Sequence, residues 1–568
     1  MKKQIKMLIA MCLVISTALS CSSCVWNMFF YKEEVSESEA DLGGETSTEG
    51  GSESESEKET EKETETEIVI EVDMATANTP EKYGLSSAEI TKVVEGLAEA
   101  GLSTHSMLVM KDGVIVAEGY ADHYDENTLH RMYSVSKSFA SMAIGLLEAE
   151  GKISLDDTID EYFPEYVTED TDERILNCTI ENLLMMATPF GKVASCGDGQ
   201  EDWIAAFFEG LDEKYQDKMK DPGTSFYYDT GASHLLGAIV ERETGMNFLE
   251  YLKEKALLEI GFSENSWCVK GPEGYAWAGS GVMCTSRDLA AFANLVMNKG
   301  VYNGKQLLPA AYVEKATSNL IATAAAEGNS EYYGYGYGYQ IWMNPYGFSF
   351  MGMGGQFAYC VPDKGLVIVF TADNQGNNEA AGIVYDLIVK HIIKKVSDQP
   401  LEENEEAYVK MLVALEKMEI PYVEGKDTSK KLSLINGKTF VSKDSGAKIT
   451  SFRLTFTGDE GMLTYITPRG EKKLFFGVGK NVECTLNEPQ YYGDTIGQAN
   501  GVGYRCLCSG AWRSDTIFVL KVQVIDDYVG NMTLVFNLGN NPTLSGTKTA
   551  EWFLNEYKMD MVEYTKVN

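Results

Sequence analysis

The sequence predicts an α+β protein. We expect an antiparallel sheet flanked by terminal helices, a mostly helical subdomain, and a small all-β domain after them. Three observations support this prediction. Hairpin signals occur near both ends of the central region, each beside a helical pattern. Helical patterns dominate the sequence between the hairpins. After residue 432, turn residues recur about every 8–12 positions between runs of alternating polarity, which is typical of a barrel or a sandwich.

The folded sequence begins near Thr79. Residues 86–101 start with serines, carry apolar residues three and four positions apart and end with glycine, which predicts a helix. The run SMLVMKDGVIVAEGYA predicts two strands joined at Asp112-Gly113. The segment FAYCVPDKGLVIVFTAD predicts a second hairpin, and residues 379–396 predict a helix after it. Since hairpins at both ends adjoin helices, we expect one sheet assembled from the two ends of this region.

Two segments precede the folded sequence. Residues 1–24 combine lysines, a short apolar run and small residues, which is the pattern of an export signal. Cys21 follows Ala18-Leu19-Ser20, and this resembles the lipid-attachment site of a bacterial lipoprotein. A signal removed after Ser20 without lipidation and an uncleaved anchor are the alternatives. Residues 25–78 are an acidic stretch too poor in apolar residues to offset chain entropy, so they predict a disordered spacer. We therefore expect an exported, membrane-anchored protein at the cell surface.

Composition narrows the function classes. A chain of 568 residues is long enough for more than one domain. A formal charge of −37 excludes a general nucleic-acid binder, because phosphate contacts need clustered Lys and Arg. Of the 11 cysteines, those beyond the signal show no metal-ligand spacing, and the CLC at Cys506 and Cys508 is closer than a zinc ribbon uses. We expect no structural metal and no cofactor.

The stretch MYSVSKSFA places Ser134 three residues before Lys137. The spacing alone is weak, because two other Ser-x-x-Lys pairs, at 445–448 and 545–548, lie in turn-like, β-rich surroundings. The apolar helix predicted after Ser134 makes this pair different. A helix N-terminus favours an alkoxide, and a lysine kept from water has a lowered pKa and can take a proton. Ser134 is therefore the candidate nucleophile and Lys137 the candidate base.

MYSVSKSF resembles the first motif of the serine β-lactamase, penicillin-binding protein and esterase superfamily, especially its class C-related members. Further segments resemble that superfamily in the same order: EGKISLDDTIDEYFPEY, CTIENLLMMATPF, PGTSFYYDTGASHLLGAIVERETG, WAGSGVMCTSRDLAAFANLVMNKGVYNGKQLL and SFMGMGGQFAYCVPDKGLVIVFTAD. The similarity implies a β-lactamase/transpeptidase-like domain over residues 79–396. Residues 397–431 predict a helical connector. Residues 432–568 predict the β-rich domain, which resembles the lipocalin-like domain of some members.

The resemblance also implies roles for single residues. Tyr228 matches the tyrosine of the second motif, Tyr-x-Asn, and would relay the proton to the leaving group, while Thr230 stands where the family has an amide. Gly354, Gly355 and Gln356 match the third motif as oxyanion and substrate-binding residues. The backbone N–H of Gly355 or Gln356 would join that of Ser134 in an oxyanion hole. Penicillin-recognising members carry a cation in the third motif, and this motif has none.

Because that cation is missing, we predict hydrolysis of an ester or amide through an acyl-Ser134 intermediate, with a small molecule or a peptide as substrate. A D,D-peptidase or β-lactamase-type penicillin-binding enzyme of the cell wall is one alternative. A non-catalytic surface-binding protein on the same fold is the other. The aromatic run at 331–343 either lines the entrance of the substrate site or has packing as its main role. Residues 277–289 are assigned to no site. Asp229 and His234 are interpreted as structural, since the chain has no Gly-x-Ser-x-Gly elbow.

Overall fold

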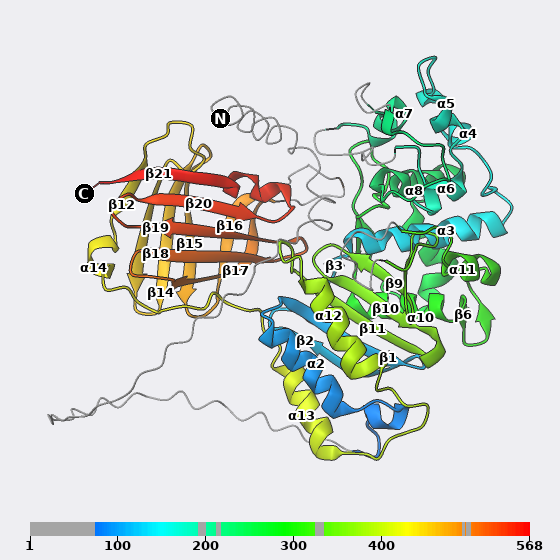
Figure 1. Ribbon diagram of the computed structural model, residues 1–568, viewed down its shortest axis with the longest axis horizontal. Coiled ribbons are helices and arrows are strands. Elements are labelled where there is room, and N and C mark those ends of the chain that lie inside the picture. The colour runs from blue at the N-terminus through cyan, green and yellow to red at the C-terminus, as the bar shows by residue number, and fades with distance from the viewer. Residues whose placement is uncertain are drawn as a thin grey trace, which may run out of the picture.

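The computed structural model describes residues 74–190, 200–211, 217–323, 334–490, 495 and 501–567. The predicted export signal, Cys21 and most of the acidic spacer lie outside these residues. Within the described part of the chain, no helix is both long and apolar enough to cross a membrane. The described chain forms a helix-and-sheet part and, beside it, a β-barrel (Figure 1).

A six-stranded antiparallel sheet, in the order β2-β1-β11-β10-β9-β8, forms the centre of the helix-and-sheet part. Its strands are β1 (Thr104–Lys111), β2 (Val114–Tyr120), β8 (Trp342–Asn344), β9 (Gly347–Gly352), β10 (Gln356–Val361) and β11 (Leu366–Ala372). β1 pairs with β11, with Met107 opposite Phe370. This pairing joins the two ends of the region and confirms the predicted topology.

Both predicted hairpins are present. β1 and β2 pair across Asp112 and Gly113, whose φ angles of 52° and 80° belong to the left-handed region that two-residue hairpin turns use. β10 and β11 pair across a 3₁₀ turn at Pro362–Lys364. The turn residues therefore set the register of both strand pairs.

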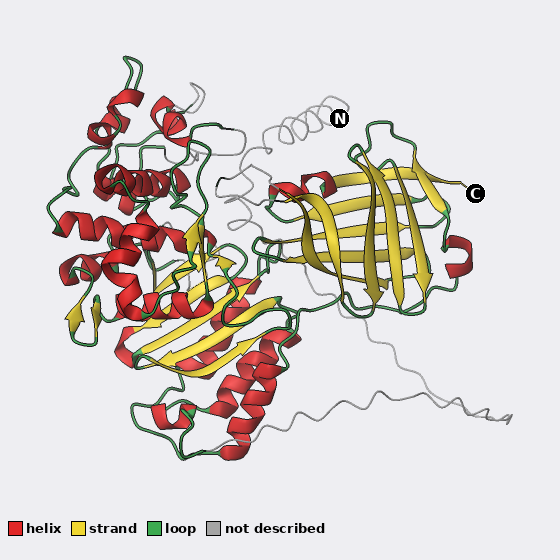
Figure 2. Ribbon diagram, turned by 180° about the vertical axis from the view of Figure 1, so that it is seen from behind, coloured by secondary structure: helices red, strands yellow, loops and turns green. Residues whose placement is uncertain are grey.

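Terminal helices cover the sheet. α2 (Ser87–Glu99) packs against α12 (Ala380–Ile388), and α13 (Glu405–Glu416) packs against α2 and β2. Figure 2 shows the sheet between the α2 and α13 pair and the helical layer. α13 lies in the stretch predicted as a connector, and it is packed onto the sheet part rather than standing free.

The helical layer is built around α3 (Ser136–Ala149), which is buried from Ser136 to Leu147. A helix that is apolar on nearly all sides is stable only inside other elements. Its neighbours are α8 (Thr230–Thr244), α9 (Phe248–Leu252) and α11 (Ala310–Ala316). The remaining helices of this layer include α4 (Ile159–Tyr162), α5 (Glu173–Leu176), α6 (Ile180–Leu184), α7 (Trp203–Glu209) and α10 (Ser286–Met297).

The C-terminal part is a barrel, which decides between the two predicted all-β architectures. Its strands are β12 (Thr439–Ser442), β13 (Ser451–Thr457), β14 (Glu460–Thr467), β15 (Gly470–Val478), β16 (Val482–Gln490), β17 (Gly501–Trp512), β18 (Ile517–Ile525), β19 (Val529–Asn537), β20 (Thr543–Lys548) and β21 (Met559–Val567). Nine of these described strands close into a ring through a short parallel pairing of β15 with β17, and β16 pairs with β17 beside this seam. Outward residues Leu507 and Ile525 join the core of the helix-and-sheet part.

The packing of α3 allows a first prediction. A Cβ added at Gly145 would lie 2.4 Å from the Tyr312 ring, whereas one added at Gly96 in α2 would meet the flexible end of Leu387. Gly145→Ala should destabilise the protein by up to about 2 kcal/mol, because overpacking costs about 1–3 kcal/mol and alanine returns about 1 kcal/mol of helix propensity. Thermal unfolding measures the effect.

The matched control is Gly96→Ala, which gains the same helix propensity against a neighbour that can move. It should leave the unfolding temperature unchanged or raise it. Equal unfolding temperatures for the two variants would contradict the tight packing of α3 against α11.

Candidate active site

Ser134 lies in a turn that is fixed on both sides. β3 (His130–Arg131) pairs with β5 (Val282–Cys284), and the Met132 N–H donates to the Val282 carbonyl at 2.8 Å. A 3₁₀ turn, Tyr133–Val135, then leads into α3. Ser134 therefore lies two residues before the first residue of α3, held by strand pairing before it and by a buried helix after it.

The residue before Ser134 has an unusual backbone. Tyr133 has φ of 46°, in the left-handed region, although it is bulky and buried. Such a conformation costs about 1–3 kcal/mol and persists only where surrounding contacts hold it. The Tyr133 hydroxyl makes one such contact, a hydrogen bond that it donates to the Glu551 carboxylate at 2.8 Å.

Lys137 is 1% exposed, and its Nζ donates to Ser134 Oγ at 3.3 Å and to the Gly279 carbonyl at 2.5 Å. The two nearby serines are engaged elsewhere. Ser136 Oγ accepts from the Val282 N–H at 3.0 Å, and Ser138 Oγ donates to the Gln340 carbonyl at 2.8 Å. Of these three serines, Ser134 is the one that shares a hydrogen bond with the buried lysine.

Tyr228 joins the same pair. Lys137 Nζ lies 5.1 Å from the centre of its ring. Burial raises the pKa of Tyr228 above its ordinary value, and the nearby Ser134 hydroxyl only partly opposes this. The phenol is therefore protonated at neutral pH. The structure brings together the three residues predicted as catalytic.

Aromatic side chains surround Tyr228. Trp342 stacks on its ring at a centroid distance of 5.5 Å, and Tyr337 meets it edge-on at 6.3 Å. Both belong to the described part of the aromatic run at 331–343 and are nearly buried. This segment packs against Tyr228 and fixes its ring.

The remaining residues of the second motif lie at the start of α8. Asp229 caps the helix by accepting from the Gly231 N–H at 2.9 Å, and it also accepts from Thr188 Oγ1 at 3.1 Å. His234 is buried and pairs with Glu273. The structural interpretation of Asp229 and His234 therefore agrees with their contacts.

Gly279 is a site residue that the sequence did not reveal. A Cβ at this position would lie 2.5 Å from Thr230 Cγ2, so only glycine lets its carbonyl reach Lys137 while Thr230 packs against it. Thr230, predicted as a substrate-binding residue, thus lies beside the acceptor of the buried lysine. The small residues of the AGSG run, 278–281, were the available signal.

The third motif lies against the nucleophile turn. A Cβ on Gly352 would lie 2.4 Å from the Met132 carbonyl, so the close approach requires glycine. Gly354 and Gly355 turn the chain with φ of 83° and 107°, and the Gly355 N–H donates to the Gly352 carbonyl at 3.3 Å. The Gln356 side chain points into the sheet, where its Nε2 donates to the Ala372 carbonyl at 2.7 Å. This hydrogen bond fixes the position of the Gln356 backbone.

A cavity of about 630 Å³ adjoins this motif. From the helix-and-sheet part it is lined by Gly354, Gly355 and Asn374, and from the barrel by Lys548 and Lys558. Ser134, Lys137 and Tyr228 do not line this cavity, so its lysines are not part of the site around the nucleophile.

A residue of the barrel also contacts the turn Tyr133–Val135 that carries Ser134. Glu551, just before the 3₁₀ helix η10 (Trp552–Tyr557), accepts from Arg131 Nη1 at 3.0 Å and from the Tyr133 hydroxyl at 2.8 Å. Arg131 and Glu551 are 4% and 5% exposed. Burial, and next the Glu551 carboxylate, raise the pKa of Tyr133, so its hydroxyl remains a donor. This contact supports the strained residue beside Ser134, and no sequence motif pointed to Glu551.

Comparison with known proteins gives the chain its relatives. The family model described as Beta-lactamase matches residues 90–403. A 6-aminohexanoate-dimer hydrolase of Paenarthrobacter ureafaciens is 26% identical over 220 residues, which are 37% of this chain and 56% of the relative. Esterase EstB of Burkholderia gladioli is 24% identical over 227 residues, 36% and 58% of the two chains. Penicillin-binding protein 4* of Bacillus subtilis is 24% identical over 166 residues, 26% and 33%.

These matches cover only part of each protein. The chain spans little more than half the length of the first two relatives and a third of the penicillin-binding protein. The family match ends at residue 403, so the barrel and Glu551 lie beyond it.

The contact of Glu551 with the nucleophile turn allows a second prediction. Glu551→Gln leaves the Arg131 guanidinium buried without a carboxylate, and breaking a buried ion pair in this way costs about 3–5 kcal/mol. The midpoint of thermal unfolding should fall by several degrees. The control is Glu563→Gln, in the same barrel, where the Lys443 pair is exposed and worth less than about 1 kcal/mol. Unchanged unfolding of Glu551→Gln would contradict the proposed support.

Proposed function

The chain belongs to the Beta-lactamase family, and we propose that it is a serine hydrolase that cleaves an ester or amide through an acyl-Ser134 intermediate. One observation carries the proposal: the Ser134 hydroxyl accepts a hydrogen bond from a buried lysine amine, beside the ring of a protonated, partly buried tyrosine. A surface serine that merely begins a helix needs neither partner. The names of two relatives, a 6-aminohexanoate-dimer hydrolase and an esterase, support the reaction class.

In the acylation step, Ser134 Oγ attacks the substrate carbonyl carbon as its proton passes to Lys137 in the neutral amine form. The Gly279 carbonyl, 2.5 Å from Nζ, holds the amine in place. The new bond joins Oγ to carbon, and the carbonyl oxygen takes the negative charge.

The negative charge on the carbonyl oxygen must be stabilised by hydrogen-bond donors directed at that oxygen. In our proposal the Ser134 N–H is one donor, and the second is the Gln356 N–H, since the Gly355 N–H is already used within the turn by Gly352. The anchored Gln356 side chain supports this assignment, because a fixed backbone donor needs no reorganisation during the reaction.

Departure of the alcohol or amine requires a proton. Tyr228 is protonated at neutral pH and lies beside Lys137, so we assign it to donate to the leaving group and to regain its proton from Lys137. Water then attacks the acyl carbon as Lys137 accepts the water's proton. The bond between the acyl carbon and Oγ breaks, Lys137 returns the proton to Ser134 Oγ, and the acid product leaves. Thr230 is assigned to orient the substrate, in place of the family's amide.

The third motif narrows the proposed substrate. Met353-Gly354-Gly355 offers no cation to a substrate carboxylate, which disfavours β-lactams and D-alanyl-D-alanine ends. In our proposal the substrate is therefore a small or peptide ester or amide. A penicillin-binding wall enzyme and a non-catalytic surface-binding protein are the rival functions.

Location is a further part of the proposal. The pattern of residues 1–24, Cys21 and the acidic run before Thr79 support export and attachment to a membrane, with the hydrolase held away from it. Lipidation of Cys21 would be detected as a mass addition on the N-terminal peptide of protein isolated from membranes.

The nucleophile can be identified by intact-mass spectrometry after exposure to a p-nitrophenyl ester, a fluorophosphonate and a penicillin. The wild type should be labelled once by the ester or the phosphonate. Ser134→Ala should not be labelled, and Lys137→Ala should be labelled about 10²–10⁴ times more slowly, because the base is lost. Ser138→Ala is the control and should behave like the wild type. Labelling by penicillin alone would favour the wall enzyme, and no label from any reagent would favour the surface-binding protein.

The role of Tyr228 gives a separate prediction. Tyr228→Phe keeps the ring stacked on Trp342 but removes the proton donor, so kcat for ester hydrolysis should fall about 10²–10⁴-fold with little change in stability. Tyr227→Phe, a change of the adjacent tyrosine, should retain activity. Steady-state kinetics on a chromogenic ester make the comparison. If both variants kept wild-type kcat, Tyr228 would have no part in proton transfer.

A further inference from the structure

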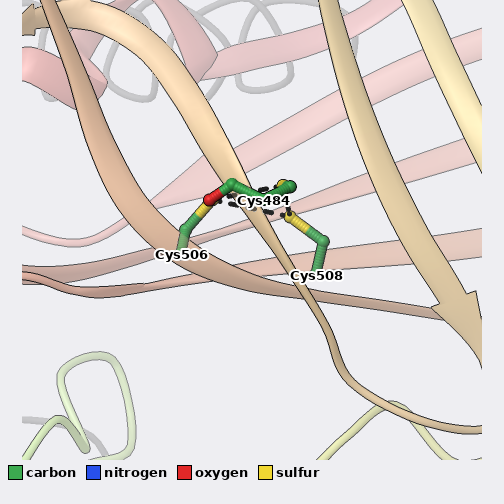
Figure 3. A group of neighbouring side chains, drawn as sticks. All are labelled: Cys484, Cys506 and Cys508. Atoms are coloured by element: carbon green, nitrogen blue, oxygen red, sulfur yellow. Dashed lines mark hydrogen bonds between the residues drawn. The ribbon is translucent and has the colours of Figure 1, made fainter. Parts of the chain in front are cut away.

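Three cysteines converge inside the barrel. Cys484 on β16 lies directly opposite Cys506 on β17, and Cys508 follows two residues later on the same face. The Sγ atoms are 3.4 Å apart for Cys484 and Cys506, 3.1 Å for Cys484 and Cys508, and 3.7 Å for Cys506 and Cys508. Figure 3 shows the three side chains directed at one another from the two strands.

The separations suit metal coordination. Thiolates bound to one cation at about 2.3 Å lie about 3.8–4.0 Å apart in tetrahedral or trigonal geometry. The observed distances are shorter by at most 0.9 Å, a change within reach of small side-chain rotations. Cys506 and Cys508 are buried, whereas Cys484 is partly exposed, so the cluster is enclosed yet reachable from one side.

We propose that Cys484, Cys506 and Cys508 bind one soft d¹⁰ cation, Cu(I) or Zn(II), as a three-thiolate site. Thiolate sulfurs select these ions over Mg²⁺, Ca²⁺ and Mn²⁺. Among the described residues, no fourth His, Cys, Asp or Glu ligand atom completes the group. Cu(I) is satisfied by three sulfurs, and Zn(II) would complete its tetrahedron with a water. The three thiols lose their protons to solvent as three metal–sulfur bonds form.

The place of the cluster indicates what the cation would do. β15 closes the barrel on β17 through only two residue pairs, Gly477 with Ser509 and Val478 with Gly510, and the first of these starts directly after Cys508. A cation shared by β16 and β17 would tie these two strands together beside the seam that β17 forms with β15. We therefore expect metal binding to stabilise the barrel, independently of the proposed hydrolase activity.

The sequence pattern predicted no metal here, because Cys484 lies 22 residues before Cys506 and the CLC pair is too close for a zinc ribbon. The pairing register of β16 with β17 brings the third sulfur, that of Cys484, beside the other two. Spacing along the chain does not reveal this register.

The test uses the full chain, reduced and handled without oxygen, and titrated with Cu(I) or Zn(II) against a chromophoric chelator. We expect one ion per chain and a higher unfolding temperature. Each of Cys484→Ser, Cys506→Ser and Cys508→Ser should weaken binding at least about 100-fold, in line with loss of a ligand. Cys360→Ser, a buried cysteine outside the cluster, is the control and should bind as the wild type does. The two titrations distinguish the copper site from the zinc site.

X-ray absorption at the metal edge of the loaded wild type keeps the test independent of how the variants fold. Three sulfur neighbours at about 2.3 Å are expected. Oxygen or nitrogen neighbours alone would overturn the proposal. Binding that survives all three serine variants would also overturn it, and so would reduced protein that takes up neither ion.

Discussion

The burial of one amine determines the arrangement of the site. Lys137 is 1% exposed, and an ammonium or amine kept from water needs partners, because burying an unsatisfied polar group is costly. Those partners come from separate segments: Ser134 from the turn before α3, Gly279 from a loop, and the Tyr228 ring from the start of α8. The buried helix α3 must therefore lie against the loop that carries Gly279 and the segment that carries Tyr228, and this contact requires that residue 279 has no side chain.

The turn that carries Ser134 is held by the barrel as well as by the sheet. The left-handed backbone of Tyr133 is compatible with a stable fold because its hydroxyl reaches Glu551, which also neutralises the buried Arg131. A second contact supports the same junction, since Asn531 Nδ2 donates to Asp373 Oδ2 at 2.9 Å. The barrel lies beyond the family match, so this support comes from a part of the chain that the family model does not cover.

Much of the fold could be predicted from local patterns. The Asp112-Gly113 and PDKG hairpins, the buried α3 and the alternating strands each follow from periodicity or turn chemistry, and the Ser134, Lys137 and Tyr228 cluster followed from ordered motifs. Other features depend on tertiary contacts that leave no local signal. Glu551 acts across more than 400 residues of sequence, glycine is required at position 279 because the Thr230 methyl group packs against it, and the cysteine cluster depends on strand register. The choice of barrel over sandwich depended on a parallel pairing of two residue pairs.

A crystal structure of the protein after reaction with a fluorophosphonate tests the central claim most directly. We predict phosphorus bonded to Ser134 Oγ, with its free oxygen accepting from the Ser134 and Gln356 N–H groups at about 2.7–3.1 Å. We also predict that Lys137 and Tyr228 lie in contact with Oγ. A label on another residue, or a phosphoryl oxygen directed away from the third motif, would contradict it.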